Sequence, residues 1–346
     1  MELIKGIEGD YLETKQNNLI FDVKGLHHPK DRKICFLRFY PSPEGDRKRE
    51  GKIYKKVYNL NERYSILRKE FPQYLFFSKE IDLEVQGVKN EDIKNIYSPR
   101  EYYQRLTEKT NLTKLENYSK ELCELCISEG DVPESSIGIT GSQMVGINKD
   151  DSDIDLIIYG TETGLEFQEK LKKIFEKSNE CRKYTIDEYK IHYNWRIGGS
   201  QISFEDFLKS ERRKLHQGKF KDVDFYIRYI KSPQDWEGNY YDSLYKNYGR
   251  IKLKAVILDT TYSIFTPCSY KIEVSKILEN NLASHDYIIE DITDINSFRG
   301  RFCEQAKKGE EILVEGKLEK AFFRNKEYYR VLLFDQVKDK MVILNK

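Results

Sequence analysis

The segment GITGSQMVGINKDDSDIDLIIYG, residues 138–160, combines a Gly-Ser step with three aspartates at alternate positions. Apolar residues at both of its ends predict two short strands, and the polar residues between them predict a turn and a loop. Asp153 and Asp155 therefore fall where the second strand begins. Aspartates in a DDSD sequence are also ordinary turn residues, so the segment offers a chemical and a structural interpretation.

The chemical interpretation starts from the spacing of Asp153 and Asp155. Residues two apart on a strand point to the same face, so the two carboxylates are expected within several ångströms of each other. Such a pair raises the pKa of each carboxyl unless a cation lies between them. Mg²⁺ prefers oxygen ligands of this kind and completes its shell with phosphates and water. The pair predicts a Mg²⁺ site, whereas Asp151 is interpreted as a loop residue.

The Gly141-Ser142 step predicts the phosphate end of the same site. A strand that ends in SIGIT and continues through Gly-Ser into QMVG is typical of a strand-to-helix turn with free amides at the helix start. Gly141 lets the backbone approach a ligand closely, and Ser142 adds a hydroxyl for a phosphate oxygen. An anion site thus precedes the carboxylate pair by about eleven residues on the chain.

Taken together, these residues resemble the signature of the nucleotidyltransferase superfamily with the DNA polymerase beta-like fold. That signature is a Gly-Ser followed by an Asp-x-Asp on the adjoining strand, and the resemblance covers about 100 to 120 residues. The layout is also similar to stand-alone archaeal and prokaryotic nucleotidyltransferase-domain proteins. The resemblance implies a sheet flanked by helices, two Mg²⁺ ions and transfer of a nucleoside monophosphate from an NTP to a hydroxyl group.

The resemblance further implies a third carboxylate on a later strand. Asp224, in KDVDFYIRYI, is the preferred residue, and Asp222 is the competitor two residues earlier. Two-metal chemistry would then divide the work. One ion, held by Asp153 and Asp155, would organise the leaving pyrophosphate, and the other, shared with Asp224, would activate the attacking hydroxyl. Asp224 could also accept the hydroxyl proton.

The whole chain is expected to be an α+β protein of three domains. Residues 1–111 read as an N-terminal α+β domain, residues 112–235 as the nucleotidyltransferase domain, and residues 236–346 as a small β-rich domain that could be a barrel. Helices are predicted near 112–127, 162–177 and 204–216, and a strand is predicted at YKIHYNW, residues 189–195. Aromatic residues in the last strands suggest base stacking or ordinary packing.

Composition limits the location and the partners. Lys and Arg number 59 against 58 Asp and Glu, so any attraction to RNA or DNA must come from local basic patches at residues 46–56 and 209–221. Either patch could instead be a solvated surface. The six cysteines, including Cys123 and Cys126, are interpreted as packed thiols of a reducing interior. No run of about 20 apolar residues suggests a membrane span, so a cytoplasmic location is expected.

The function predicted from the sequence is a Mg²⁺-dependent nucleotidyltransferase that uses an NTP and most readily acts on a nucleic-acid 3′ end. Two alternatives remain at this point. The enzyme could modify a protein or a small molecule, or the fold could serve as a catalytically silent nucleic-acid-binding or regulatory module.

Overall fold

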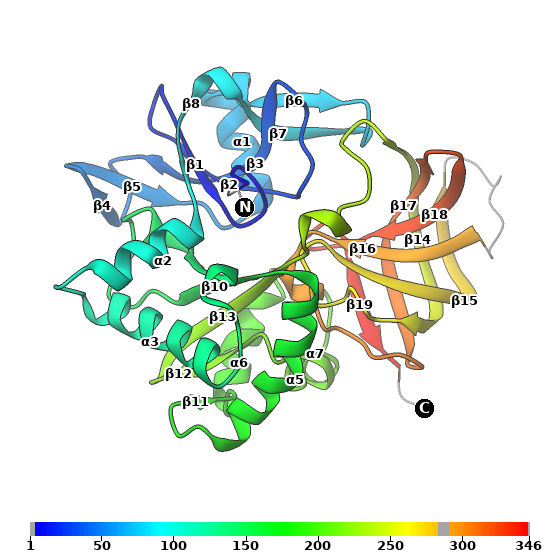
Figure 1. Cartoon of the computed structure of the whole chain (residues 1–346). Coiled ribbons are helices and arrows are strands. Elements are labelled where there is room, and N and C mark those ends of the chain that lie inside the picture. Colours follow the sequence, from blue (N-terminus) through cyan, green and yellow to red (C-terminus); the bar gives the residue numbers. More distant parts are fainter. Residues whose placement is uncertain (1–3, 283–290, 345–346) are drawn as a thin grey trace. The chain divides into compact units, whose positions relative to one another are not determined.

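The computed structural model describes residues 4–282 and 291–344, and within them it combines helices with three β-sheets. The protein is therefore of the α+β class, as the sequence predicts. Its chain divides into two compact units (Figure 1). The first unit holds residues 1–78, 83–182 and 216–240, and the second holds residues 79–82, 183–215 and 241–346.

The N-terminal strands build the first sheet of the first unit. Its order is β4-β5-β3-β2-β1-β8, with β7 added to β3 and β6 added to β7. One face buries Leu12, Phe21 and Leu37 against Leu67 of helix α1, because alternate strand residues are apolar. The strands are β1 (Tyr11–Thr14), β2 (Ile20–Val23), β3 (Arg32–Pro41), β4 (Arg47–Arg49), β5 (Lys52–Lys56), β6 (Leu75–Ser78), β7 (Leu83–Lys89) and β8 (Ile93–Tyr97).

The two helices of this region begin in different ways. The side chain of Asn59 accepts hydrogen bonds from the amides of Asn61 and Glu62 and starts α1 (Leu60–Glu70). Helix α2 (Pro99–Glu108) begins at Pro99 after Ser98, whose side chain makes no capping hydrogen bond. The short 3₁₀ turns η1 (Pro72–Tyr74) and η2 (Asn90–Asp92) connect the strands.

The second sheet of the first unit contains the opening motif. Its order is β11-β12-β13-β10-β9, in which β10 runs antiparallel to β9 and parallel to β13. The strands are β9 (Ile137–Thr140), β10 (Ile154–Tyr159), β11 (Cys181–Arg182), β12 (Gln217–Phe220) and β13 (Val223–Ile230). The accompanying helices are α3 (Lys114–Ser128), α4 (Gly141–Met144) and α5 (Thr161–Lys177).

The helices at 112–127 and 162–177 are thus confirmed. Helix α3 begins with a capping box between Thr113 and Glu116, and it buries both Cys123 and Cys126 as free thiols. The interpretation of these cysteines as packed helix residues is therefore correct.

The strand predicted at residues 189–195 is wrong. These residues lie in helix α6 (Ile186–Arg196), which starts with a capping box between Thr185 and Glu188. The alternation of large and polar residues was misleading, and the Thr-x-x-Glu signal decides the local structure. Helix α7 (Phe204–Glu211) follows and is shorter than the predicted span of 204–216. Both helices belong to the second unit.

The remaining strands of the second unit pair around a ring. Strand β14 pairs with β15, β15 with β16, β16 with β18, β18 with β17, and β17 returns to β14, while β19 extends from β17. Only the pair β16–β18 is parallel among these described pairings. We call this the C-terminal ring. Its strands are β14 (Ser243–Asp259), β15 (Cys268–Leu282), β16 (Ile292–Ser297), β17 (Glu311–Phe323), β18 (Lys326–Leu332) and β19 (Lys340–Ile343).

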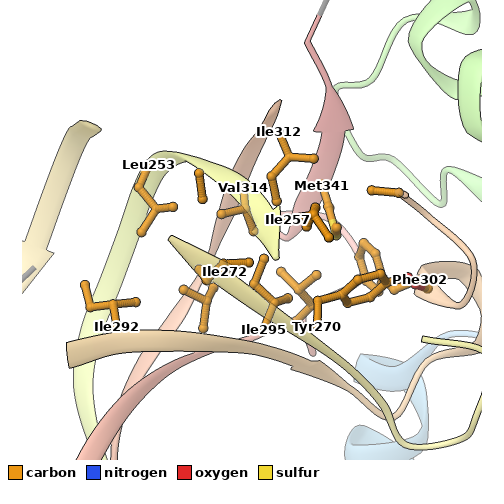
Figure 2. Packing of buried hydrophobic residues seen from close by; sticks show 14 of the residues in the cluster. Leu253, Ile257, Tyr270, Ile272, Ile292, Ile295, Phe302, Ile312, Val314 and Met341 are labelled. Carbon is orange, nitrogen blue, oxygen red and sulfur yellow. Dashed lines mark hydrogen bonds between the residues drawn. The ribbon is translucent and has the colours of Figure 1, made fainter. Parts of the chain in front are cut away.

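Apolar side chains from every strand of the C-terminal ring fill its interior (Figure 2). Leu253, Ile272, Ile295 and Val314 come from four different strands and are at most 4% exposed. The β-rich segment therefore has a hydrophobic core of its own. In the described part of the chain, no helix is long and apolar enough to cross a membrane.

The three segments predicted as domains are distributed over both units. Residues 4–78 and 83–111 lie in the first unit together with most of residues 112–235, whereas residues 183–215 lie in the second unit with nearly all of residues 241–346.

The C-terminal core provides a matched test of this packing. Leu253 is fully buried on β14, whereas Leu258 on the same strand is 45% exposed. We expect Leu253→Ala to lower the free energy of unfolding of the second unit by about 2–5 kcal/mol, because it leaves a cavity. Leu258→Ala should cost less than about 1 kcal/mol. Urea unfolding of the full-length protein measures both, and equal losses would contradict the described core.

Candidate functional site

The fold brings the Gly-Ser step and the aspartate pair into direct contact. Thr140, the last residue of β9, pairs with Asp155 on β10. Gly141 follows with a φ of +80°, and a Cβ atom placed on it would lie 2.3 Å from Oδ2 of Asp155. Only glycine therefore fits between the chain turn and this carboxylate. The two halves of the sequence motif form one site.

Ser142 lies at the start of α4, where it is 6% exposed. Within the described residues its hydroxyl has no hydrogen-bond partner, although its carbonyl accepts from the amide of Ile147 at 2.9 Å. Next to it, Nε2 of Gln143 donates to Oγ of Ser119 at 2.8 Å and fixes the turn to α3. The turn is fixed by these contacts, and the Ser142 hydroxyl is left to donate a hydrogen bond to a bound anion.

Asp153 and Asp155 form an acidic pair without a bonded counter-ion in the described part of the chain. Burial, followed by the charge of Asp153, raises the pKa of Asp155 to about 7, although Arg228, Lys56 and Arg38 oppose the shift. Asp153 itself is exposed, and Asp155 is partly buried. Neither carboxylate has a hydrogen bond or an ion pair within the described part of the chain. Two adjacent carboxylates without a bonded counter-charge are the arrangement that a further cation would stabilise.

Asp224, the predicted third carboxylate, lies on the strand next to the acidic pair and contacts a lysine. Parallel pairing matches Ile154 with Phe225 and Asp155 with Tyr226, so Asp153 and Asp224 occupy corresponding positions one residue earlier. Asp224 is exposed, and its Oδ2 lies 3.4 Å from Nζ of Lys219.

The competitor Asp222 occupies a different kind of position. It lies in the turn between β12 and β13 with a φ of +64°, and its carboxylate pairs with Arg182 at 2.8 Å. This placement makes Asp222 a turn residue. Asp151, in the loop before β10, is exposed.

The metal hypothesis fits two of the three predicted ligands in this conformation. In residues 4–282 and 291–344, no group of three or more His, Cys, Asp and Glu side chains is gathered closely enough to hold a metal ion. Asp153 and Asp155 offer the oxygen atoms that Mg²⁺ prefers, and Mg²⁺ commonly takes only one or two carboxylates. The pair therefore fits such an ion, and Asp224 would join it only after leaving Lys219.

Three cations that the sequence analysis did not assign to the site surround the acidic pair. Arg38 of β3, Lys56 of β5 and Arg228 of β13 all interact electrostatically with Asp155. Arg38 and Lys56 come from the N-terminal sheet, more than 90 residues before Asp155. No spacing rule links them to Asp155, so their position near the acidic pair could not be predicted from sequence patterns.

Internal partners engage part of the patch at 46–56 and most of the patch at 209–221. In the patch at 46–56, Arg47 is buried and its Nη1 donates to the carbonyl oxygen of Ile147 at 2.8 Å. In the patch at 209–221, five of the six cations have carboxylate partners, which are Lys209–Asp206, Arg213–Glu310, Lys214–Glu211, Lys219–Asp224 and Lys221–Glu121. Lys56, in the patch at 46–56, forms no hydrogen bond or ion pair within the described residues.

Comparison with known proteins gives one clear relationship. The chain is 30% identical over 330 residues to the uncharacterized protein MJ1086 of Methanocaldococcus jannaschii, and the match covers 93% of each chain. The chain belongs to the same family as MJ1086. No protein-family profile matches the sequence, and no solved structure matches it.

The close approach of Gly141 to Asp155 can be tested with alanine. Gly141→Ala should lower the free energy of unfolding by about 2–4 kcal/mol, because it combines a positive φ with a clash against the carboxylate. Gly51→Ala is the matched control, since Gly51 has a φ of +75° and open space around the added Cβ. It should cost only about 1–2 kcal/mol. Equal losses in chemical denaturation would contradict the contact.

The repulsion between Asp153 and Asp155 also predicts a substitution that stabilises the folded state. The raised pKa of Asp155 means that its charged form disfavours the folded state, with the full cost present above about pH 7. At pH 8 without divalent cations, Asp155→Asn should therefore raise the free energy of unfolding by about 2–4 kcal/mol. Asp151→Asn should change it by less than about 0.5 kcal/mol. Thermal and urea unfolding measure both, and a destabilised Asp155→Asn variant would refute the account.

Proposed function

We propose that this protein is a Mg²⁺-dependent nucleotidyltransferase that transfers a nucleoside monophosphate from an NTP to a hydroxyl acceptor. The observation that carries the proposal is the contact between Gly141 and the carboxylate of Asp155, which has no bonded partner within the described residues. It joins an anion-accepting turn to a cation-accepting pair. An NTP bound with Mg²⁺ carries both kinds of charge, so it matches the two halves of the site.

Each residue has a role in this proposal. Asp153 and Asp155 would hold Mg²⁺, which when bound neutralises phosphate charge and lowers the pKa of a hydroxyl group. The turn at Gly141 and the hydroxyl of Ser142 would bind and orient phosphate oxygens. Asp224 would first have to release Lys219, with which it now forms an ion pair. Its carboxylate would then serve as the third ligand and as the base for the acceptor hydroxyl. Most of the catalytic effect would come from positioning and charge neutralisation.

The acceptor in this proposal is the 3′ end of an RNA or a DNA. Support comes from the C-terminal ring, because five-stranded barrels of related architecture bind oligonucleotides. On its strands β14 and β17, Nζ of Lys246 and Nζ of Lys320 lie 5.5 Å and 5.1 Å from the centre of the Phe322 ring. Interleaved lysines and aromatic rings are typical of surfaces that bind single-stranded nucleic acid.

A transfer assay tests the proposal. The full-length protein is incubated with Mg²⁺, each α-labelled NTP and separate cellular RNA, DNA and protein fractions. We expect label in a nucleic-acid fraction, lowered about 100-fold or more by Asp153→Asn and by Asp155→Asn, because each removes a charge that positions the ion. Asp151→Asn is the matched control and should retain activity.

The other outcomes separate the remaining functions. Label in the protein fraction would keep the enzyme and change its acceptor. Label in no fraction, together with nucleic-acid binding that the two aspartate substitutions leave unchanged, would refute transfer and favour a silent binding module.

A further inference from the structure

Two cations of the N-terminal sheet, Arg38 and Lys56, lack the partners that neutralise their neighbours. Within the described residues, neither side chain forms a hydrogen bond or an ion pair, and Nε of Arg38 is buried without an acceptor. Both are only partly accessible to solvent. Although burial disfavours its charged form, Tyr11, Asp22, Asp155 and Asp153 raise the pKa of the Arg38 guanidinium. The acidic pair is thus a nearby but unbonded counter-charge of both cations, whose donor groups remain available to a bound anion.

Both cations are held at one place by Tyr58. Nζ of Lys56 lies 4.7 Å from the centre of the Tyr58 ring, and Cζ of Arg38 lies 5.8 Å from it. Tyr58 is itself 52% exposed, so this group opens to solvent. Burial, followed by the charge of Arg38, lowers the pKa of Lys56 to about 8, whereas Asp153 and Asp155 act in the opposite direction. The two positive charges therefore lie close to each other and to the acidic pair.

The other charges of this region satisfy one another. Nη1 of Arg228 lies 2.6 Å from Oε1 of Glu8, and Nζ of Lys24 lies 2.9 Å from Oδ2 of Asp22. These four residues form a neutral network behind the site. Arg38 and Lys56 remain as the cations without a bonded partner around Asp155.

The N-terminal sheet is anchored to both ends of the motif loop. Oγ1 of Thr140, just before Gly141, donates to the carbonyl oxygen of Gly9 at 2.6 Å. Arg47 of β4 bonds the carbonyl oxygen of Ile147 beyond α4. These contacts fix the cation-bearing strands next to the Gly-Ser turn.

We propose that Arg38 and Lys56 bind the polyphosphate tail of a nucleoside triphosphate, so that the N-terminal sheet completes the nucleotide site. This inference rests on the proposed function for the identity of the nucleotide. The guanidinium offers the planar fork of its terminal N–H groups to phosphate oxygens, and the ammonium contributes a compact charge. Arg38 and Lys56 are positioning residues for the phosphates that the acidic pair and Ser142 do not reach.

A polyphosphate fits this group better than a nucleic-acid backbone does. The two cations converge on one partly buried spot, whereas successive phosphodiesters carry single charges along an extended strand. An anion with several charges on adjacent phosphates matches such a spot. Arg38, Lys56, Asp153 and Asp155 together then provide both signs of charge that a Mg²⁺-nucleotide complex requires.

Equilibrium titration of the full-length protein with inorganic tripolyphosphate, in the presence of EDTA, tests the inference without metal or acceptor. We expect Arg38→Gln and Lys56→Gln each to weaken binding about tenfold or more, since each removes charged hydrogen bonds. Lys52→Gln is the matched control, because Lys52 is an exposed lysine on the same strand, β5. It should change binding less than about twofold. Lys56→Arg should restore most of the affinity.

Several results would overturn the inference. Wild-type protein that does not bind tripolyphosphate, equal weakening in all three glutamine variants, or unchanged binding in Arg38→Gln and Lys56→Gln would each do so. A parallel titration with a single-stranded oligonucleotide gives a further contradicting result. If the substitutions weaken only oligonucleotide binding, the cations contact the backbone of the acceptor instead. Thermal unfolding shows whether each variant is folded. If Arg38→Gln does not fold, the comparison of Lys56→Gln with Lys56→Arg tests the inference.

Failure of this inference and failure of the proposed function give different results. Specific tripolyphosphate binding with no label transfer to any fraction supports the anion site and refutes transfer. Transfer activity that is unchanged by Arg38→Gln and Lys56→Gln supports the enzyme and refutes the role of the N-terminal sheet.

Discussion

The site depends on one constraint: the carboxylate of Asp155 lies against Gly141 and forms no hydrogen bond or ion pair within the described residues. Asp155 is partly buried, its neighbour Asp153 carries the same charge, and Gly141 is the residue whose missing Cβ makes room for it. A fold does not need this arrangement for stability, because an unpaired acidic pair favours protonation or a bound cation. Proteins retain such local costs mainly at functional sites.

The surrounding structure keeps this arrangement in place. Strand β10 is paired on both sides, with β9 in one direction and β13 in the other, so the backbone of Asp155 cannot shift to relieve the repulsion. The N-terminal sheet adds further contacts through Thr140 and Arg47. It also carries Arg38 and Lys56 to the site. Residues of both sheets of the first unit thus lie around the acidic pair.

Local signals in the sequence predicted the elements of the site well. The alternation of Asp153 and Asp155 before an apolar strand, and the Gly-Ser step before a helix, depend on neighbouring residues and are readable directly. The α+β class and the helices α3 and α5 followed from the same periodicity. The position of α6 was missed because its alternating aromatic residues outweighed the capping box at Thr185 and Glu188.

Long-range features could not be read from the sequence in the same way. Arg38 and Lys56 reach Asp155 through the pairing of β3 and β5 and the docking of two sheets, which no spacing encodes. The partners of the basic segment at 209–221 were equally hidden, because its carboxylates come from distant parts of the chain. Likewise, the interaction of Asp224 with Lys219 depends on cross-strand register.

The most direct test of the central claim is a crystal structure of the full-length protein with Mn²⁺ and a non-hydrolysable nucleoside triphosphate. Anomalous scattering locates Mn²⁺, which accepts the same oxygen ligands as Mg²⁺. The account predicts an anomalous peak coordinated by Asp153 and Asp155, with the phosphates over Gly141 and Ser142. A nucleotide bound elsewhere, or no peak at the acidic pair, would contradict it.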